Sequence, residues 1–257
     1  MIDTAVIPAA GYGLRMRPLT TVIPKEMFPL GKIPVIEYIV IELVSSGIQR
    51  ICVVIRKGKD MIRDYFLQRK EQYKNIELYF AYQESPLGLG DALRCAKDFV
   101  NKRPFVMAIP DQILLSDTPA TGQLLNASKG ETAIWNSMAR IYSDELSFFK
   151  GSRPLDSKNI TEELYIIEDI SPDENSLTRG FGRTIFMPEA FEFMTKEYIN
   201  EKTGEVDFLK TFKALKNSFK LYGFLLKGRA CDIGSWEGYY YYLPLILNHI
   251  SLEARAS

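Results

Sequence analysis

The feature that most constrains the fold of this sequence is a regular alternation of strand-like and helix-like segments over its first 111 residues. Strand-like segments occupy residues 4–8, 51–55, 76–82 and 105–109. Between them, apolar side chains recur at helical spacing over residues 34–44, 59–69 and 89–100. Strands and helices that alternate in this way predict a mostly parallel sheet with right-handed crossovers and helices on both faces. We therefore expect an α/β fold.

The second half of the chain is less regular. Strand-like segments occupy residues 132–142, 182–187 and 219–226, and helical stripes occupy residues 189–199, 206–215 and 236–250, with Pro244 as an expected kink. The polar stretch 143–163 predicts an insertion or a lid. The aromatic run 239–242 has no interleaved basic residues, so it predicts a core or subunit contact rather than a base-stacking platform. Because residues 239–242 could form a subunit contact, a homo-oligomer is one possible state of the protein.

The charge balance excludes several classes of function. Lys and Arg total 32 and Asp and Glu total 32, which argues against nucleic acid or a membrane as a partner. His249 is the single histidine, so neither a Ser-His-Asp triad nor a multi-histidine metal centre is expected. Chemistry in this chain must then rest on carboxylates, lysine, arginine, backbone amides and a hard metal ion.

Three sequence properties bear on location. No leader-like segment precedes the first predicted strand, and no apolar run reaches 18 residues. The three cysteines show no disulfide-framework spacing. We therefore expect a soluble cytoplasmic protein.

The loop after the first predicted strand carries glycines and arginines. Gly11 and Gly13 let backbone amides approach a polyanion, and Arg15 and Arg17 add guanidinium groups suited to phosphate. Met16 stands where a dinucleotide fingerprint needs its third glycine, which makes a nicotinamide oxidoreductase a weak alternative. A Walker A loop is excluded because the loop lacks Gly-Lys followed by Ser or Thr.

Three further residues are placed for phosphate and metal chemistry. Lys25 lies between two prolines in an apolar segment. This predicts that its ammonium group points back to the loop that contains Gly11 and Gly13, here called the glycine loop. Asp111 follows the strand 105–109, and Asp232 lies between a predicted strand and the last helix. Ligands bind at the carboxyl ends of such strands, and Mg²⁺ is typically held by one or two carboxylates with substrate phosphates. The sequence therefore predicts a Mg²⁺ site at Asp111 and Asp232.

Together these motifs resemble those of the sugar-phosphate nucleotidyltransferases. The matching runs are Ala5-Val6-Ile7-Pro8-Ala9-Ala10-Gly11-x-Gly13-x-Arg15, Ile23-Pro24-Lys25-Glu26-Met27-x-Pro29-Leu30, Gln83-Glu84-Ser85-Pro86-Leu87-Gly88, Ile109-Pro110-Asp111 and Asp232-Ile233-Gly234. The Pro-Lys-Glu-Met form is most similar to the bacterial UTP–glucose-1-phosphate uridylyltransferases. The similarity is strong over residues 4–111 and weaker beyond them.

The resemblance implies a single Rossmann-like domain. Residues 1–111 would bind nucleotide, and residues 112–257, with an inserted part near 143–163, would bind the sugar acceptor. The implied reaction joins a nucleoside triphosphate to a sugar 1-phosphate and releases pyrophosphate, with UTP favoured and dTTP next. The implied roles are nucleotide binding by Ala10, Gly11, Gly13, Glu26, Gln83 and Gly88, catalysis by Arg15 and Lys25, Mg²⁺ binding by Asp111 and Asp232, and sugar binding by Glu168, Gly182 and Arg183.

The acceptor side departs from the family's pattern. The family's Val-Glu-Lys-Pro motif corresponds to residues 167–170 of this chain. Asp169 therefore stands where the family has the lysine that pairs with the sugar phosphate. We expect Arg179 or Arg183 to supply the missing cation, because an anion beside an incoming phosphate is unfavourable. The acceptor is left open as glucose 1-phosphate or another phosphorylated sugar or polyol. The alternative is a catalytically silent homologue that binds nucleotide or sugar nucleotide as a regulatory subunit.

Overall fold

The seven segments predicted for the first half are present in the structure, a computed structural model that describes residues 2–85, 87–151, 155–171, 173–194 and 208–256. The strands are β1 (Thr4–Pro8), β4 (Arg50–Ile55), β5 (Glu77–Tyr82) and β6 (Phe105–Ala108). The helices are α1 (Val35–Ser45), α2 (Asp60–Gln68), α3 (Leu89–Arg94) and α4 (Lys97–Val100). The last two replace one predicted helix, because Ala96 has φ −95° and ψ 1° and leaves helical geometry.

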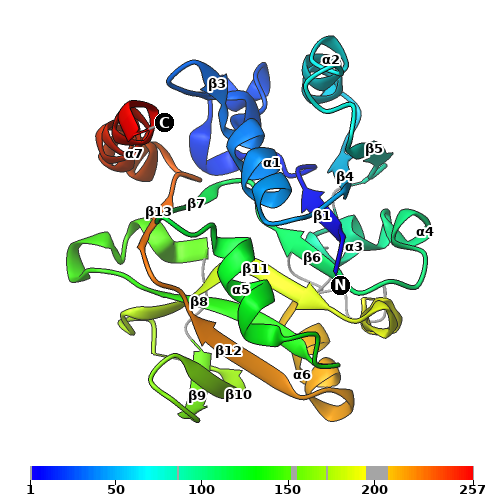
Figure 1. The fold of residues 1–257 in the computed structure, drawn as a ribbon, viewed down its shortest axis with the longest axis vertical. Coiled ribbons are helices and arrows are strands. Elements are labelled where there is room, and N and C mark those ends of the chain that lie inside the picture. The colour runs from blue at the N-terminus through cyan, green and yellow to red at the C-terminus, as the bar shows by residue number, and fades with distance from the viewer. Residues whose placement is uncertain (1, 86, 152–154, 172, 195–207, 257) are drawn as a thin grey trace.

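These four strands form one half of the nine-stranded sheet in the described part of the chain (Figure 1). The other strands are β8 (Ile134–Arg140), β9 (Leu155–Asn159), β10 (Leu164–Ile170), β11 (Thr178–Phe186) and β12 (Leu221–Leu225). Their order is β5-β4-β1-β6-β11-β8-β12-β10-β9. Only β11 and β10 run against both of their neighbours, so the remaining strands share one direction. The prediction of a mostly parallel mixed sheet is confirmed.

Helices cover both faces of this sheet, and each face has its own core. Alternate residues of β1 divide between them, since Ile7 belongs to the core under α1 and α2, whereas Val6 belongs to the core under α3. The later helices are α5 (Ala120–Ser128), α6 (Phe208–Ser218) and α7 (Trp236–Ala256). Side chains of α5 and α7 join the first core and those of α6 join the second.

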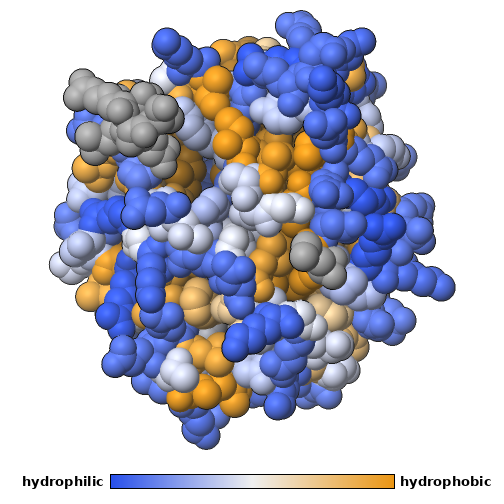
Figure 2. Space-filling model, viewed as in Figure 1, coloured by the Kyte–Doolittle hydropathy of each residue, from blue (hydrophilic) through white to orange (hydrophobic). Residues whose placement is uncertain are grey.

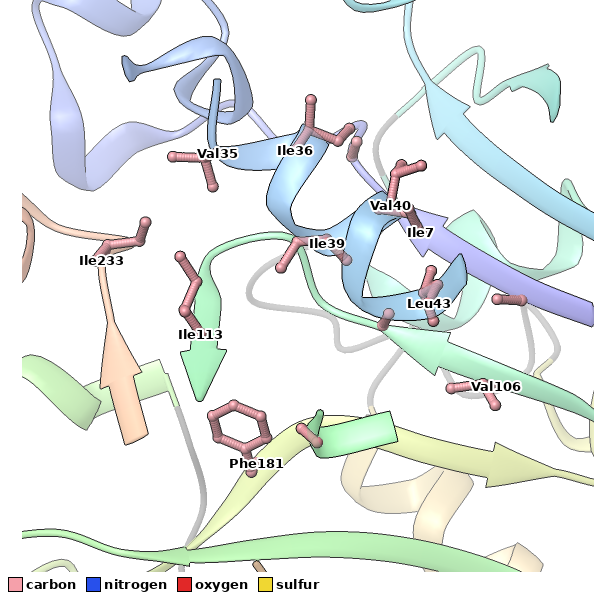
Figure 3. Close-up of a cluster of buried hydrophobic side chains, with 14 of the residues drawn as sticks. Ile7, Val35, Ile36, Ile39, Val40, Leu43, Val106, Ile113, Phe181 and Ile233 are labelled. Carbon is pink, nitrogen blue, oxygen red and sulfur yellow. The ribbon is translucent and has the colours of Figure 1, made fainter. Parts of the chain in front are cut away.

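The apolar stripe predicted on α1 forms the centre of the first core. Of the predicted stripe residues, Val35, Ile36, Ile39, Val40 and Leu43 are at most 2% exposed, and Val44 is partly buried against the same core. In Figure 3 the first five lie beside Ile7 of β1, Val106 of β6 and Ile113. The helix begins directly after Pro34 and ends before Gly47, whose φ of +89° is a left-handed conformation that glycine adopts without strain.

Two short ladders were not predicted from periodicity. β2 (Pro29–Leu30) pairs with β3 (Ile33–Pro34) in the loop before α1. β7 (Gln112–Leu115) pairs antiparallel with β13 (Arg229–Asp232), which joins the middle of the chain to the segment before α7. Strands of two to four residues are too short to show a hydrophobic period, and their pairing is set by tertiary contacts.

The least regular part of the sequence differs most from the prediction. The segment 143–163 contains two 3₁₀ turns and then β9, the edge strand of the main sheet, while residues 152–154 lie outside the described residues. A 3₁₀ helix, Pro188–Phe193, stands at the start of the predicted helix 189–199. Residues 195–199 and 206–207 of the two predicted helices lie outside the described residues. α7 continues through Pro244.

The face seen in Figure 2 is mostly hydrophilic, with a band of apolar residues that passes over α1. Ile41 of α1 is one exposed apolar residue, at 47%. Within the described ranges, no helix has the length and apolar character needed to cross a lipid bilayer.

Candidate active site

The loop after β1 brings glycine backbone and cationic side chains to the carboxyl end of that strand. Gly13 has a left-handed φ of +65°, and its carbonyl accepts a hydrogen bond from Thr20 Oγ1 at 2.8 Å. A Cβ atom on Gly11 would have no neighbour within 4 Å apart from the adjacent residues of the chain. The chain then forms three 3₁₀ turns, η1 (Leu14–Met16), η2 (Leu19–Thr21) and η3 (Lys25–Met27). The first and third of these turns place Arg15 and Lys25.

Arg15 and Lys25 converge on Asp111. The Lys25 ammonium donates a hydrogen bond to Asp111 Oδ2, and Arg15 Nη2 lies 4.0 Å from the same oxygen. Burial alone would raise the pKa of Asp111 and lower that of Lys25. The opposite charges outweigh burial, so the pKa of Asp111 is lowered and that of Lys25 is raised. Both groups are therefore ionised at neutral pH.

Asp232 is brought to the same place by the β7–β13 ladder. Its register partner is Gln112, the neighbour of Asp111, and the Ile233 amide donates to the Asp111 carbonyl at 2.9 Å. Asp232 Oδ1 accepts from the Gly234 amide at 3.0 Å, and Oδ2 accepts from Gln112 Nε2 at 3.1 Å. Burial and the charge of Asp111 raise the pKa of Asp232 to about 6. The two carboxylates predicted to bind metal are thus buried side by side.

The absence of a side chain at Gly234 lets its backbone lie close to Asp111 and Arg15. A Cβ atom on Gly234 would lie 2.4 Å from Asp111 Oδ2 and 2.8 Å from Arg15 Nη2. Such contacts are far inside van der Waals distance, so any side chain at position 234 must displace one of these charged groups.

Lys59, which no sequence motif predicts, is a buried cation beside the glycine loop. Its ammonium donates to the Ala9 carbonyl at 2.7 Å and to Glu26 Oε2 at 2.8 Å, and the residue is only 3% exposed. Burial lowers the pKa of Lys59, and the charge of Glu26 offsets part of that shift. Lys59 therefore ties the end of β1 to η3. Its sequence context, directly before α2, gives no sign of this role.

Lys59→Met is expected to lower the free energy of unfolding by about 1–3 kcal/mol, because the Ala9 carbonyl and Glu26 would lose a buried donor. Urea denaturation at neutral pH measures the change. Lys57→Met, at an exposed position on the same loop, is the matched control. Equal stability of the two variants would contradict the structural role of Lys59.

The residues predicted to recognise nucleoside occupy two places. Gln83, directly after β5, donates from Nε2 to Asp91 Oδ2 at 2.7 Å and to the Gly88 carbonyl at 3.3 Å. Gly88 has φ +93°, which again favours glycine. Glu26 lies on η3, where Oε2 binds Lys59 and the buried Oε1 has no hydrogen-bond partner among the described residues. Ala10, also predicted, is 1% exposed in the second core.

A cavity of about 150 Å³ adjoins the two aspartates. Gln112, which directly follows Asp111, and Ile109, two residues before Asp111, line it together with Gly182. The Gly182 amide donates to Gln112 Oε1 at 2.6 Å, so Gly182 orients the same carboxamide that contacts Asp232. Of the residues predicted to bind sugar, Gly182 is the one that lines this cavity.

Arg183 differs from its expected role. Its guanidinium is fully buried, and all five N–H groups are used. Nε and Nη2 donate to the two oxygens of Glu42 at 2.8 and 2.6 Å. The remaining bonds go to the carbonyls of Ile109, Gly182 and Gln112. Arg183 therefore joins α1, β7 and β11 and has no donor left for a phosphate.

The other candidates for the acceptor side are also engaged elsewhere. Arg179 is 2% exposed and donates to Glu174 and to the Ser176 carbonyl. Glu168 Oε1 pairs with Lys158 at 2.9 Å, and Glu168 is not among the residues that line the cavity. Asp169 Oδ1 accepts the Ile170 amide at 2.8 Å. Sequence alone could not separate a buried structural arginine from one that binds phosphate.

A family model and two curated proteins match this chain. Residues 4–149 match the family model described as nucleotidyl transferase. A Bacillus subtilis protein with the provisional name UTP–glucose-1-phosphate uridylyltransferase is 34% identical over 98% of both chains. A Streptococcus pneumoniae protein named UTP–glucose-1-phosphate uridylyltransferase is 30% identical over 93% of this chain and 88% of its own.

Solved structures share the fold. An apo UDP-glucose pyrophosphorylase superposes with a TM-score of 0.84 at 24% identity, covering 95% of this chain and 98% of the other. A UTP-bound enzyme of the same kind from Acinetobacter baumannii gives a TM-score of 0.80 at 23% identity, covering 95% and 93%.

Proposed function

Because this chain belongs to the nucleotidyl transferase family, we propose that it transfers a uridylyl group from UTP to a sugar 1-phosphate and releases pyrophosphate. The observation that carries the proposal is the convergence of Arg15, Lys25, Asp111 and Asp232 at the carboxyl ends of β1 and β6. The names of the curated relatives support UTP as the donor. The proposal keeps dTTP as the next choice because Gln83 can pair with either uracil or thymine.

The proposed reaction is an in-line displacement at the α-phosphorus of UTP. An oxygen of the sugar phosphate forms the new P–O bond, and the bond to the departing pyrophosphate breaks. The attacking oxygen is already ionised in a phosphate monoester, so no side-chain base is needed. Catalysis then rests on positioning and on charge stabilisation. This agrees with a site that contains lysine, arginine and aspartate and lacks histidine within the described residues.

The basic residues would stabilise the transferred and leaving groups. Arg15 is 44% exposed along its side chain, so its guanidinium can turn toward a bound triphosphate. Lys25 is held at Asp111 and would keep its charge near the α-phosphate. The glycine loop would contribute backbone amides from residues 11–13. Gln83 and Gly88 are proposed to contact the uracil base.

The two aspartates fit a divalent metal. Burial, and then the neighbouring charge of Asp111, raise the pKa of Asp232, so both effects disfavour its ionised form. A hard cation with oxygen ligands from Asp111, Asp232 and substrate phosphates would offset these effects, which suits Mg²⁺. When bound, the ion would supply positive charge to the phosphate oxygens.

Pyrophosphate release tests the proposal. UTP, dTTP, CTP, ATP and GTP are each combined with glucose 1-phosphate and other sugar 1-phosphates, with Mg²⁺ or with EDTA. We expect release with UTP, a lower rate with dTTP and none with EDTA. Nucleotide binding without release for every acceptor would instead favour a regulatory homologue.

Gly234→Ala is expected to lower kcat by about a hundredfold, because the new methyl group must displace Asp111 or Arg15 by roughly 1 Å. Gly122→Ala is the matched control, since a Cβ atom there meets its nearest neighbour at an ordinary 3.4 Å. Steady-state kinetics of both variants measure the effect. Wild-type turnover by Gly234→Ala would show that the close approach is not needed.

The metal requirement should depend on pH. With a pKa of about 6, Asp232 is mostly protonated at pH 5.5 and ionised at pH 7.5. Because Mg²⁺ binds the ionised form, the Mg²⁺ concentration for half-maximal rate should be about fourfold higher at pH 5.5. Magnesium titrations of the rate at the two pH values measure this ratio. An unchanged requirement would contradict the assignment of Asp232 as a ligand.

A further inference from the structure

The cavity beside the two aspartates has an apolar wall. Leu155 of β9, Ile170 of β10 and Phe212 of α6 line it, together with Met107 of β6 and Phe181 of β11. None of the described residues that line it carries a charge. An apolar cavity of about 150 Å³ can hold one six-membered ring.

The polar side chains in the wall already have partners. Ser137 Oγ lies 2.9 and 2.7 Å from the carbonyl oxygens of Phe181 and Arg183, so its single hydrogen is shared between them, and it accepts from the Arg183 amide at 3.2 Å. Thr184 Oγ1 bonds to Asn136 Oδ1 at 3.3 Å. The carboxamide of Gln112 is used by Gly182 and Asp232. Among the described residues that line the cavity, few side-chain hydrogen-bonding groups are therefore free for the hydroxyls of a bound molecule.

The position of the cavity assigns it to the acceptor. Its walls come mainly from β8, β9, β10, β11 and α6. The residues proposed to bind nucleotide lie on the loops after β1 and β5, and Leu89, which follows Gly88, is the lining residue next to them. Gln112, at the inner end of the cavity, touches Asp232. An acceptor whose phosphate reaches the α-phosphorus of UTP would place its ring in this cavity. This step depends on the proposed function.

We propose that the acceptor is a deoxysugar 1-phosphate, whose deoxygenated carbons face Leu155, Ile170 and Phe212. A hexose 1-phosphate would bury several hydroxyls against this wall. A buried hydroxyl that lacks a partner weakens binding by about tenfold, whereas a C–H or methyl group in its place gains apolar contact. The acceptor side of the cavity thus selects for fewer hydroxyls than glucose carries.

The test compares kcat/KM, with saturating UTP and Mg²⁺, for glucose 1-phosphate and its 2-, 3-, 4- and 6-deoxy analogues. We expect at least one deoxy analogue to exceed glucose 1-phosphate by about tenfold or more. If glucose 1-phosphate equals or exceeds every analogue, the inference fails and the uridylyl transfer stands. If no acceptor releases pyrophosphate, the proposed function fails, and this inference fails with it.

A pair of variants on β10 tests the wall directly. Ile170→Thr adds a hydroxyl to the cavity wall, whereas Ile166→Thr changes a residue that is 40% exposed and does not line the cavity. Ile170→Thr should shift the kcat/KM ratio of the best deoxy analogue to glucose 1-phosphate toward glucose by about tenfold. Ile166→Thr should leave the ratio unchanged. An unchanged ratio in Ile170→Thr, with both acceptors still used, would overturn the assignment of this wall to the sugar.

Discussion

The Asp111→Asn variant is expected to keep its fold and to lose about a thousandfold in kcat with UTP and an active acceptor. The substitution removes one of the two carboxylates proposed to bind Mg²⁺. It also removes the charge that holds Lys25 in place, because the Lys25 ammonium donates to Asp111 Oδ2. Both losses act on the charge balance around the α-phosphorus, so the effect should appear in kcat more than in KM for UTP.

Asp117→Asn is the matched control for this variant, since Asp117 follows β7 at an exposed position. Circular dichroism and the midpoint of thermal unfolding should show both variants folded. Turnover by Asp111→Asn within tenfold of the wild type would remove Asp111 from the proposed metal site.

Arg183→Met should lower the free energy of unfolding by about 3–5 kcal/mol, because it removes the positive charge paired with Glu42 and the guanidinium donors to the carbonyls of Ile109, Gly182 and Gln112. Denaturation with urea at neutral pH measures the loss. The double variant Glu42→Leu with Arg183→Met should recover part of it, since removal of both charges leaves no buried anion. If the free energy of unfolding falls by less than 1 kcal/mol and the KM for the acceptor rises tenfold, Arg183 binds the sugar phosphate and is not a structural residue.

The same ion pair gives a pH dependence with a definite sign. Burial alone would raise the pKa of Glu42, but the charge of Arg183 outweighs it and the pKa is lowered from 4.5. A carboxyl group whose pKa is lowered by folding stabilises the protein at pH values above its unfolded-state pKa. This stabilisation is lost as the pH falls through the folded-state pKa. The stability difference between wild type and Glu42→Gln should therefore be large at pH 7 and shrink below about pH 4.

The fold of the first half follows from local pattern. The stripe Val35, Ile36, Ile39, Val40 and Leu43 has helical spacing, and each of these side chains is buried in the structure. The short ladder β7–β13 has no such period, because its bond between Gln112 and Asp232 spans 120 positions in sequence. Pairings of this kind depend on the finished sheet and leave no local signal.

In the candidate site, too, the residues that lie in local motifs are predictable from the sequence, and those defined by distant contacts are not. Arg15, Lys25, Asp111 and Asp232 were predicted because they sit in motifs or at strand ends, and the structure brings all four together. Lys59 was missed because its partners, Ala9 and Glu26, are distant in sequence.

The acceptor side was the hardest to predict, because its chemistry depends on which polar groups are already paired. The sequence alone predicts that Arg183 is a cation available to bind phosphate. In the structure, all of its guanidinium N–H groups donate to Glu42 and to backbone carbonyls. The apolar wall of the cavity combines residues from β6, β9, β10, β11 and α6, which no single motif contains.

The most direct test of the central claim follows the phosphorus atoms of UTP with a radioactive label. The enzyme is incubated with Mg²⁺, an active sugar 1-phosphate and UTP labelled at either the α- or the γ-phosphate. Attack at the α-phosphorus predicts that the α-label enters the nucleotide sugar and that the γ-label leaves as pyrophosphate. Recovery of the γ-label on the sugar, or of the α-label only as UMP with every acceptor, would contradict nucleotidyl transfer at this site.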